Sequence, residues 1–222
     1  MKTLSIVFAI TLGLVSLPAY AQMRNRVPKP MERYNRTAKG SNMAEWQRRL
    51  SDPQVHVRLE ALQSIGEEGG EESVKPLLQA MADSDRRVRV KAIDLLGQVG
   101  DPAATEVLVQ ALFLNNVEHS IKERILAALG RIRDPASVER LLDFSSQTDD
   151  SRLLCMCIFA LGEIADPKTR GPIRSLKEAW DDADVDRLAD DALAKIDARI
   201  AAAPTQQPSI LELEKRLGPR RP

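Results

Sequence analysis

Residues 88–97 read Val-Arg-Val-Lys-Ala-Ile-Asp-Leu-Leu-Gly, and this stretch decides the fold because versions of it recur along the chain. Three further copies occupy residues 57–66, 121–130 and 153–162. Every copy closes with a glycine, and successive glycines are 31, 33 and 32 residues apart, at Gly66, Gly97, Gly130 and Gly162. A period of this length is typical of a solenoid, whose units cannot bury their apolar faces alone and therefore stack.

Each copy carries the pattern of a helix followed by a turn. In the first copy, Val57, Ala61 and Ile65 recur at helical spacing, and no alternation of period two competes with it. The closing glycine predicts the end of this helix, because a C-terminal turn favours a residue that tolerates positive φ. An Asp-Pro pair such as Asp101-Pro102 then predicts the start of a second helix.

These signals predict a helical hairpin in every copy. We expect second helices over residues 74–81, 105–112 and 138–144, and an N-terminal helix over 44–50. A degenerate fifth copy covers residues 188–197, with Asp197 where the other copies have glycine. The predicted fold class is therefore all-α, a right-handed α-solenoid of about five helical hairpins over residues 42–202.

The copies resemble the short HEAT-like repeats of bacteria, the kind also found in phycobilin lyases. The resemblance rests on the pairs Val57-Arg58 and Val88-Arg89, on Ala-Leu within the first helix, on its closing glycine and on Asp-Pro before the second helix. It weakens later in the chain, where Lys122 and Leu154 stand at the arginine position. The resemblance implies that the first helices form the convex face of the solenoid and the second helices the concave face.

The first 21 residues have the pattern of a secretory signal peptide. Lys2 precedes an apolar run of about 14 residues, and Ala19-Tyr20-Ala21 has the small-x-small pattern of a cleavage site. A membrane anchor is the alternative, but a spanning helix needs about 20 apolar residues. We therefore expect cleavage before Gln22, a mature chain without a transmembrane segment, and location in the periplasm or outside the cell.

Basic arms flank an acidic body. Residues 22–40 carry six basic residues and one acidic residue, residues 204–222 carry four and two, and residues 41–203 carry 21 and 29. We expect residues 22–41 to lack stable structure, and two interpretations stay open for the arms: solvated tails, or contact with anionic lipid, an acidic partner or the body itself. Residues 203–222 combine a proline-bearing linker with a short amphipathic segment, 210–217, which either caps the solenoid or binds a partner.

Reaction chemistry is not indicated by any cluster in the sequence. His56 and His119 lie in different copies with no metal-ligand spacing, and neither precedes glutamate, so the His-Glu iron sites of HEAT-like hydroxylases are not carried over. Cys155 and Cys157 lie two apart on one predicted helix, where we expect free thiols rather than a redox pair. We expect no enzyme activity, no cofactor and no metal, and bilin attachment is not carried over from the resemblance either.

Binding is the function that remains, and the concave face of a solenoid is the expected place for it. Eight polar side chains on the second helices are the candidates: Lys75, Gln79, Glu106, Gln110, Glu139, Asp143, Arg174 and Lys177. A polar ridge of mixed charge suits a protein or peptide partner, so we expect a scaffold or adaptor of the cell envelope. The alternative is a carrier or accessory factor for a small apolar or lipidic ligand, and the acidic body disfavours nucleic acid.

Overall fold

The computed structural model describes residues 42–202, and all regular structure in this range is helical. Residues 42–49 form a first helix. The α-helices that follow are α3 (Val55–Glu68), α4 (Glu71–Ala80), α5 (Arg86–Val99), α6 (Thr105–Leu112), α7 (His119–Ile132), α8 (Val138–Gln147), α9 (Ser151–Ile164), α10 (Arg170–Ala179) and α11 (Ala183–Ala202). Three short 3-10 helices, η2 (Pro102–Ala104), η3 (Pro135–Ser137) and η4 (Pro167–Thr169), precede α6, α8 and α10. The prediction of an all-α solenoid is confirmed: residues 46–202 form one compact unit with four hairpins and the additional helix α11.

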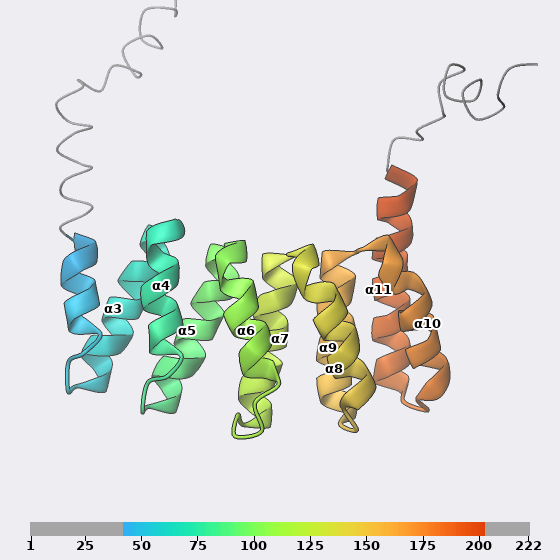
Figure 1. Cartoon of the computed structure of the whole chain (residues 1–222), viewed down its shortest axis with the longest axis horizontal. Helices are drawn as coiled ribbons and strands as arrows, with labels where there is room; N and C mark the ends of the chain where they lie inside the picture. Colours follow the sequence, from blue (N-terminus) through green and yellow to red (C-terminus); the bar gives the residue numbers. More distant parts are fainter. Residues whose placement is uncertain (1–41, 203–222) are drawn as a thin grey trace, which may run out of the picture. The chain divides into compact units, whose positions relative to one another are not determined.

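The hairpins stack side by side in two rows (Figure 1). One row contains α3, α5, α7, α9 and α11, and each of these helices packs directly against the next. The other row contains α4, α6, α8 and α10, and each of these packs on the odd-numbered helix that follows it. The core of the molecule therefore runs continuously between the two rows.

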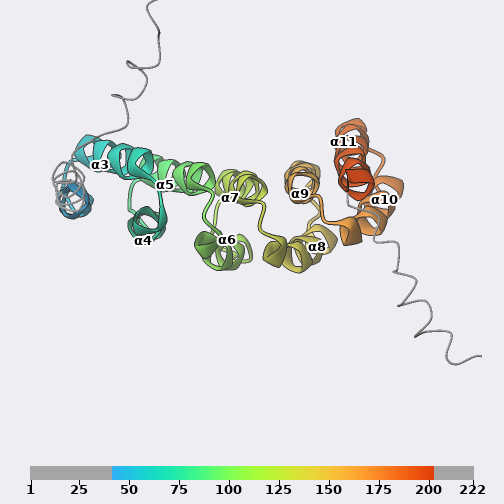
Figure 2. The same ribbon diagram turned by 90° about the horizontal axis from the view of Figure 1, so that it is seen from above.

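Both rows bend in the same sense. Seen from above, the array curves toward the side on which the row of α3, α5, α7, α9 and α11 lies (Figure 2). We call α3, α5, α7, α9 and α11 the inner row because they lie on the concave side, and α4, α6, α8 and α10 the outer row. The expectation that the second helices line the concave face is thus wrong for this chain, because these helices occupy the outer row.

The repeated glycines explain the bend. A Cβ atom added at Gly97 would lie 2.9 Å from the Cα of Ala128, and one added at Gly130 would lie 3.0 Å from the Cα of Ala160. Real Cβ contacts are longer, so only glycine lets these neighbouring helices approach so closely. Close spacing in the inner row, without the same spacing in the outer row, curves the array toward the inner row.

The glycines do not end their helices, contrary to the sequence-based expectation. The inner helices continue for about another turn and end at residues with positive φ: Gly69 (64°), Gly100 (69°), Arg133 (57°) and Ala165 (52°). At the last three of these positions the backbone is left-handed and its amide donates to a carbonyl four residues earlier. The copies thus carry two separate requirements, one for packing inside the helix and one for its end.

The predicted turn signals are confirmed as helix starts. Asp101, Asp134 and Asp166 each accept a hydrogen bond from the amide two residues later, at the start of η2, η3 and η4. Asp85 caps α5 and Asp150 caps α9 in the same way. The Asp-Pro pairs therefore start each second helix through a short 3-10 turn.

The fifth copy is displaced from the predicted register. Ala192 of α11 packs on Gly162 as Ala160 packs on Gly130, so Ala194 and not Asp197 occupies the glycine position of this copy. Asp182 supports this register, because its carboxylate accepts from the Asp184 and Val185 amides at the start of α11. The period between copies stays at 32 residues.

An ion pair with little solvent exposure fixes α3 to the loop between the first two hairpins. Arg58 on α3 donates from Nε and Nη2 to the carboxylate of Asp83, at 2.8 and 2.9 Å, and Nη1 donates to the Asp52 carbonyl oxygen at 2.9 Å. Burial alone would raise the pKa of Asp83, but the hydrogen bonds from Arg58 and from the Asp85 amide hold it below its ordinary value. The Val-Arg signature of the repeat therefore has a structural role here.

Replacing Gly97 by alanine tests the role of the packing glycines. We expect Gly97→Ala to reduce the free energy of unfolding by about 1–3 kcal/mol, because the methyl group forces α5 and α7 apart. The measurement is urea denaturation followed by circular dichroism. Gly171→Ala is the matched control, since no atom lies within 4 Å of its added Cβ, and a similar loss in both variants would contradict this explanation.

Candidate functional site

Charged side chains on the inner row are paired across neighbouring repeats. Asp94 of α5 meets Arg124 of α7 at 3.5 Å, and Glu123 of α7 meets Arg152 of α9 at 2.7 Å. Glu163 of α9 bridges to α11 through Lys195, whose Nζ lies 3.0 Å from its Oε1. These pairs tie the inner helices together and leave fewer free charges for a partner.

Glu163 is the carboxylate most strongly held by these contacts. Arg133, which caps the end of α7, donates a hydrogen bond to it, and Lys195 donates a second. These hydrogen bonds outweigh the effect of burial and hold the pKa of Glu163 below its ordinary value. The group therefore stays ionised and serves as a structural anion between three repeats.

The eight predicted binding residues lie on the outer row, two on each helix. Seven are exposed and Lys177 is half-buried. Gln110 donates to Glu106 at 2.7 Å, Arg140 pairs with Asp143 at 3.4 Å, and Lys177 pairs with Asp190 of α11 at 2.6 Å. The predicted ridge thus exists on the convex side, and its role in binding stays a prediction.

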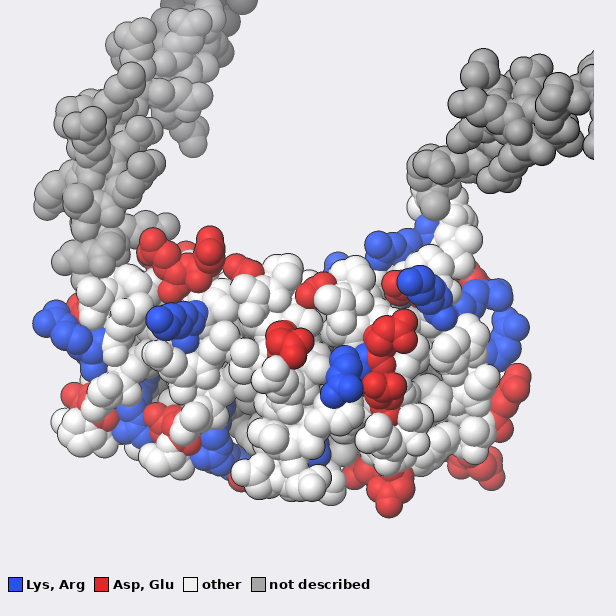
Figure 3. Space-filling model, viewed as in Figure 1, with Lys and Arg blue, Asp and Glu red and all other residues white. Residues whose placement is uncertain are grey.

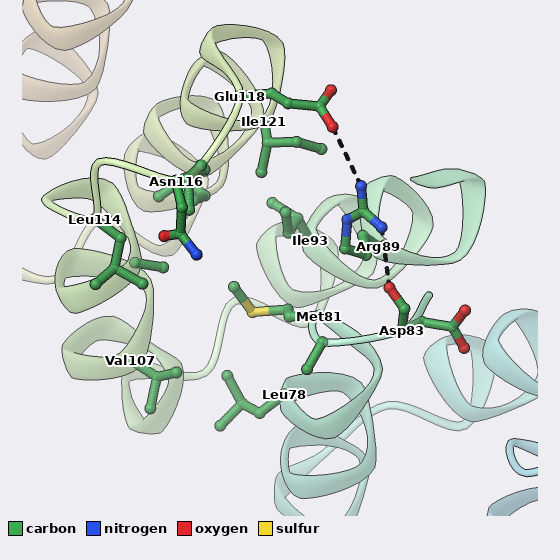
Figure 4. A pocket seen from close by; sticks show the side chains of 14 residues that line it. Leu78, Met81, Asp83, Arg89, Ile93, Val107, Leu114, Asn116, Glu118 and Ile121 are labelled. Carbon is green, nitrogen blue, oxygen red and sulfur yellow. Dashed lines mark hydrogen bonds and ion pairs between the residues drawn. The ribbon is translucent and has the colours of Figure 1, made fainter. Parts of the chain in front are cut away.

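An apolar groove lies between α4 and α6, with a volume of about 500 Å³ (Figure 4). Leu78 of α4 and Met81 just after that helix form one wall, and Val107 of α6 and Leu114 just after it form the other. Isoleucine side chains cover its floor: Ile93, Ile121 and Ile125 are all buried. The surface that α4 and α6 present to the viewer in Figure 3 carries few charged side chains.

The polar end of the groove is built by the loops that follow α4 and α6. Arg89 donates to the carbonyl oxygens of Asp83 and Ser84, at 3.0 and 3.1 Å, and to Glu118 at 3.3 Å. Glu118 also pairs with Arg86 at 3.1 Å. The arginine therefore fixes the two loops, and the groove keeps one apolar and one charged end.

The sequence analysis missed this groove, although a signal for it exists. Fourteen residues after each packing glycine the chain has Ala80, Ala111, Phe144 and Leu176. Phe144 fills the space between α6 and α8, where it meets Phe113 edge to face at 5.8 Å between ring centroids. Ala111 leaves the corresponding space between α4 and α6 open.

The two cysteines are free thiols, as predicted. Cys157 is fully buried, donates to the Leu141 carbonyl oxygen at 3.1 Å, and burial raises its pKa to about 12. Cys155 is half-buried in a shallow, largely charged pocket, where burial and the carboxylates of Asp182 and Asp184 raise its pKa. Neither thiol is activated as a nucleophile, because both are held in the protonated form.

The histidines and carboxylates of residues 42–202 do not gather into a metal centre. His56 and His119 are exposed, and the described part of the chain brings no three His, Cys, Asp or Glu side chains together in a way that could hold a metal ion. No helix between residues 42 and 202 is long and apolar enough to cross a membrane. The signal peptide, the basic arms and the amphipathic segment 210–217 lie outside the described residues.

The family comparisons agree with this architecture. A family model described as HEAT repeats matches residues 44–118, and one described as PBS lyase HEAT-like repeat matches residues 121–147. Residues 44–118 and 121–147 therefore match HEAT-type repeats, and residues 42–202 have the fold of a solenoid of HEAT-like hairpins. No curated protein sequence matches the chain.

Solved structures show the same fold at low sequence identity. The complex of CpcE and CpcF of phycocyanin lyase from Nostoc sp. PCC7120 matches at 17% identity with a TM-score of 0.57, over 72% of this chain and 66% of that chain. This chain thus spans just under two thirds of the length of that relative. Human deoxyhypusine hydroxylase in complex with glycerol matches at 14% identity, over 74% and 99% of the two chains, with a TM-score of 0.48. An engineered protein matches at 19% identity, over 72% and 80%, also with a TM-score of 0.48.

Thiol labelling tests the environment of the cysteines. We expect Cys155 to react slowly with Ellman's reagent in the native protein and Cys157 not to react, because burial raises both thiol pKa values and closes access to Cys157. Cys155→Ser should remove the native reaction, and denaturant should expose both thiols in the parent protein. Rapid native labelling of two thiols would contradict this assignment.

Proposed function

We propose that this chain is a non-catalytic protein-interaction scaffold of the cell envelope that holds a protein partner on the outer row of its HEAT-like solenoid. The proposal makes the inner row a structural spine and the outer row the binding surface. It is supported by a difference between the two rows in how neighbouring helices are joined by ion pairs.

One observation carries the choice of surface. The inner row links α5 to α7, α7 to α9 and α9 to α11 by ion pairs, through Asp94, Glu123 and Glu163. Within residues 42–202 no ion pair joins one outer helix to the next, and the charged pairs there stay within α8 or run from α10 to α11. The outer charges are therefore available to a partner at little cost to the solenoid.

Export of the chain is part of the proposal. Its support is the pattern of residues 1–21, with a basic start, an apolar run and the ending Ala19-Tyr20-Ala21. An extracytoplasmic scaffold also fits the thiols, because the buried Cys157 is protected from oxidation by the fold.

A carrier for a small apolar ligand is the second candidate, and the groove between α4 and α6 is the observation that favours it. Its volume of about 500 Å³ lies within the range of small-molecule sites. The pocket beside Cys155 of α9 suits an apolar ligand less well, because its lining is largely charged.

Charge reversal on the two rows tests the scaffold. A tagged mature chain, residues 22–222, is used to capture proteins from its own envelope extract. We expect a defined protein that is lost with the triple variant Lys75→Glu, Glu106→Lys and Glu139→Lys, because these exposed charges face the partner. The matched control reverses Lys91 and Arg131 on the inner-row helices α5 and α7, which form no ion pair within residues 42–202.

Two outcomes of this capture would contradict the proposal. One is recovery that the outer-row variant leaves unchanged while the inner-row control abolishes it, which would place the partner on the concave side. The other is recovery of no protein together with a small molecule in native mass spectra of the purified chain, which would favour the carrier.

The export step has its own measurement. We expect the protein from a periplasmic extract to begin at Gln22, because the signal peptidase cleaves after Ala21. Mass spectrometry of the N-terminal peptide gives the result, and Ala19→Leu with Ala21→Leu should block cleavage. An intact N-terminus in the parent protein would show that the segment is retained.

A further inference from the structure

The groove between α4 and α6 leaves apolar surface open to solvent. Val107 and Leu114 on its rim are 41% and 52% exposed, which is unusual for large apolar side chains in this molecule. The buried floor continues directly into these rim residues. A continuous apolar surface of this kind is typical of a binding site for apolar side chains.

The groove, with a volume of about 500 Å³, has space for the apolar side chains of a helix. In the next repeat gap, between α6 and α8, the space is closed by the single ring of Phe144 at the position of Ala111. The gap between α4 and α6 therefore lacks the side-chain volume that Phe144 supplies between α6 and α8. An occupant with leucine or isoleucine side chains would replace it.

One segment of the chain carries such side chains without an assigned role. Residues 210–217 read Ile-Leu-Glu-Leu-Glu-Lys-Arg-Leu, with apolar residues at 210, 213 and 217. This is the i, i+3, i+7 spacing with which a helix presents apolar anchors to a groove. The sequence left open whether the segment caps the solenoid or binds elsewhere.

The structure argues against a cap at the end of the array. In the register set by Ala192, Asp186 and Asp190 of α11 stand where α9 has the fully buried Leu154 and Ile158. These carboxylates are exposed, so the far side of α11 is already polar and closes the solenoid without a further element. Apart from Ile200, which is 44% exposed near its end, α11 offers no large exposed apolar side chain.

A long path separates the segment from the groove of its own molecule. The linker from Ala202 to Ile210 spans at most about 29 Å when fully extended. The path from α11 to α6 crosses α9 and α7, at about 8–10 Å a step. The C-terminal ends of α4 and α6 also lie at the opposite edge of the array from the last residue of α11 (Figure 1), which lengthens this path.

We propose that residues 210–217 of one molecule dock as an amphipathic helix into the α4–α6 groove of a second molecule. The contact is head-to-tail, since groove and segment are different surfaces, and repetition of it builds a chain of solenoids or closes a ring. This self-association goes beyond the scaffold role and does not depend on the identity of a partner.

Charge sets the direction of docking. Glu118 lies exposed at the loop end of the groove, and Lys75 lies near the other end, on the first half of α4. The segment has Glu212 in its first half and Lys215 and Arg216 in its second. A helix that runs parallel to α4 therefore brings opposite charges together at both ends.

Sedimentation velocity of the mature chain, residues 22–222, over a range of concentrations tests the docking. We expect association that rises with concentration and a dissociation constant that increases about tenfold or more in Ala111→Phe, which fills the groove, and in Leu213→Asp, which removes an apolar anchor. Ala179→Phe, on the exposed end of α10, and Gln206→Asp, in the linker before the segment, are the matched controls and should associate like the parent.

Mixing the two variants separates this contact from other kinds of association. Ala111→Phe keeps a working segment and Leu213→Asp keeps a working groove, so an equimolar mixture should form dimers and stop there. Circular dichroism shows whether Ala111→Phe folds. If this variant is unfolded, Leu213→Asp still tests the proposal, because residue 213 lies outside the solenoid.

Several outcomes would overturn the proposal. These are a monomeric parent protein at all concentrations, association that both variants leave intact, and a mixture that associates no better than either variant alone. A monomer whose groove carries a lipid in native mass spectra would assign the groove to a small ligand instead. A monomer in which labels on residue 213 and Ile200 lie close together would place the segment on α11 of its own molecule.

Discussion

The close approach of neighbouring inner helices is the constraint on which the rest of the molecule depends. Gly97 against Ala128, and Gly162 against Ala192, allow backbone contact that any side chain would prevent. The outer helices have no equivalent contact, so the two rows differ in spacing and the array bends toward the closer one. The same difference leaves gaps between outer helices, which side chains then fill or leave open.

The sequence predicted the helical hairpins, their period and their starts because these depend on local signals. It did not predict what the repeated glycine does, since a helix end and a close helix contact both favour glycine. The second glycine of the early copies, Gly69 or Gly100, hints at two separate roles. In the later copies the residues with positive φ are Arg133 and Ala165, which no sequence signal marks as helix ends. Only the structure therefore separates the packing position from the helix end in these copies.

The candidate site was predicted in part for a related reason. Apolar spacing within one helix identifies its exposed positions, and Glu106 and Glu139 are indeed exposed. The spacing does not say on which side of a curved array those positions lie, because curvature arises from contacts between copies. The groove was missed because it depends on a difference between copies, alanine at 111 against phenylalanine at 144, and not on any residue that recurs.

The two ends of the array bring these arguments together. A stack of repeats needs an end that does not invite another repeat, and α11 meets this need by placing Asp186 and Asp190 where α9 has buried apolar residues. Charge on α11 thus stops the stacking through the core, while the inner row keeps its rigid spacing. Any longer assembly of these molecules must then use another surface, and the open side of α6 is the place where apolar area is left for it.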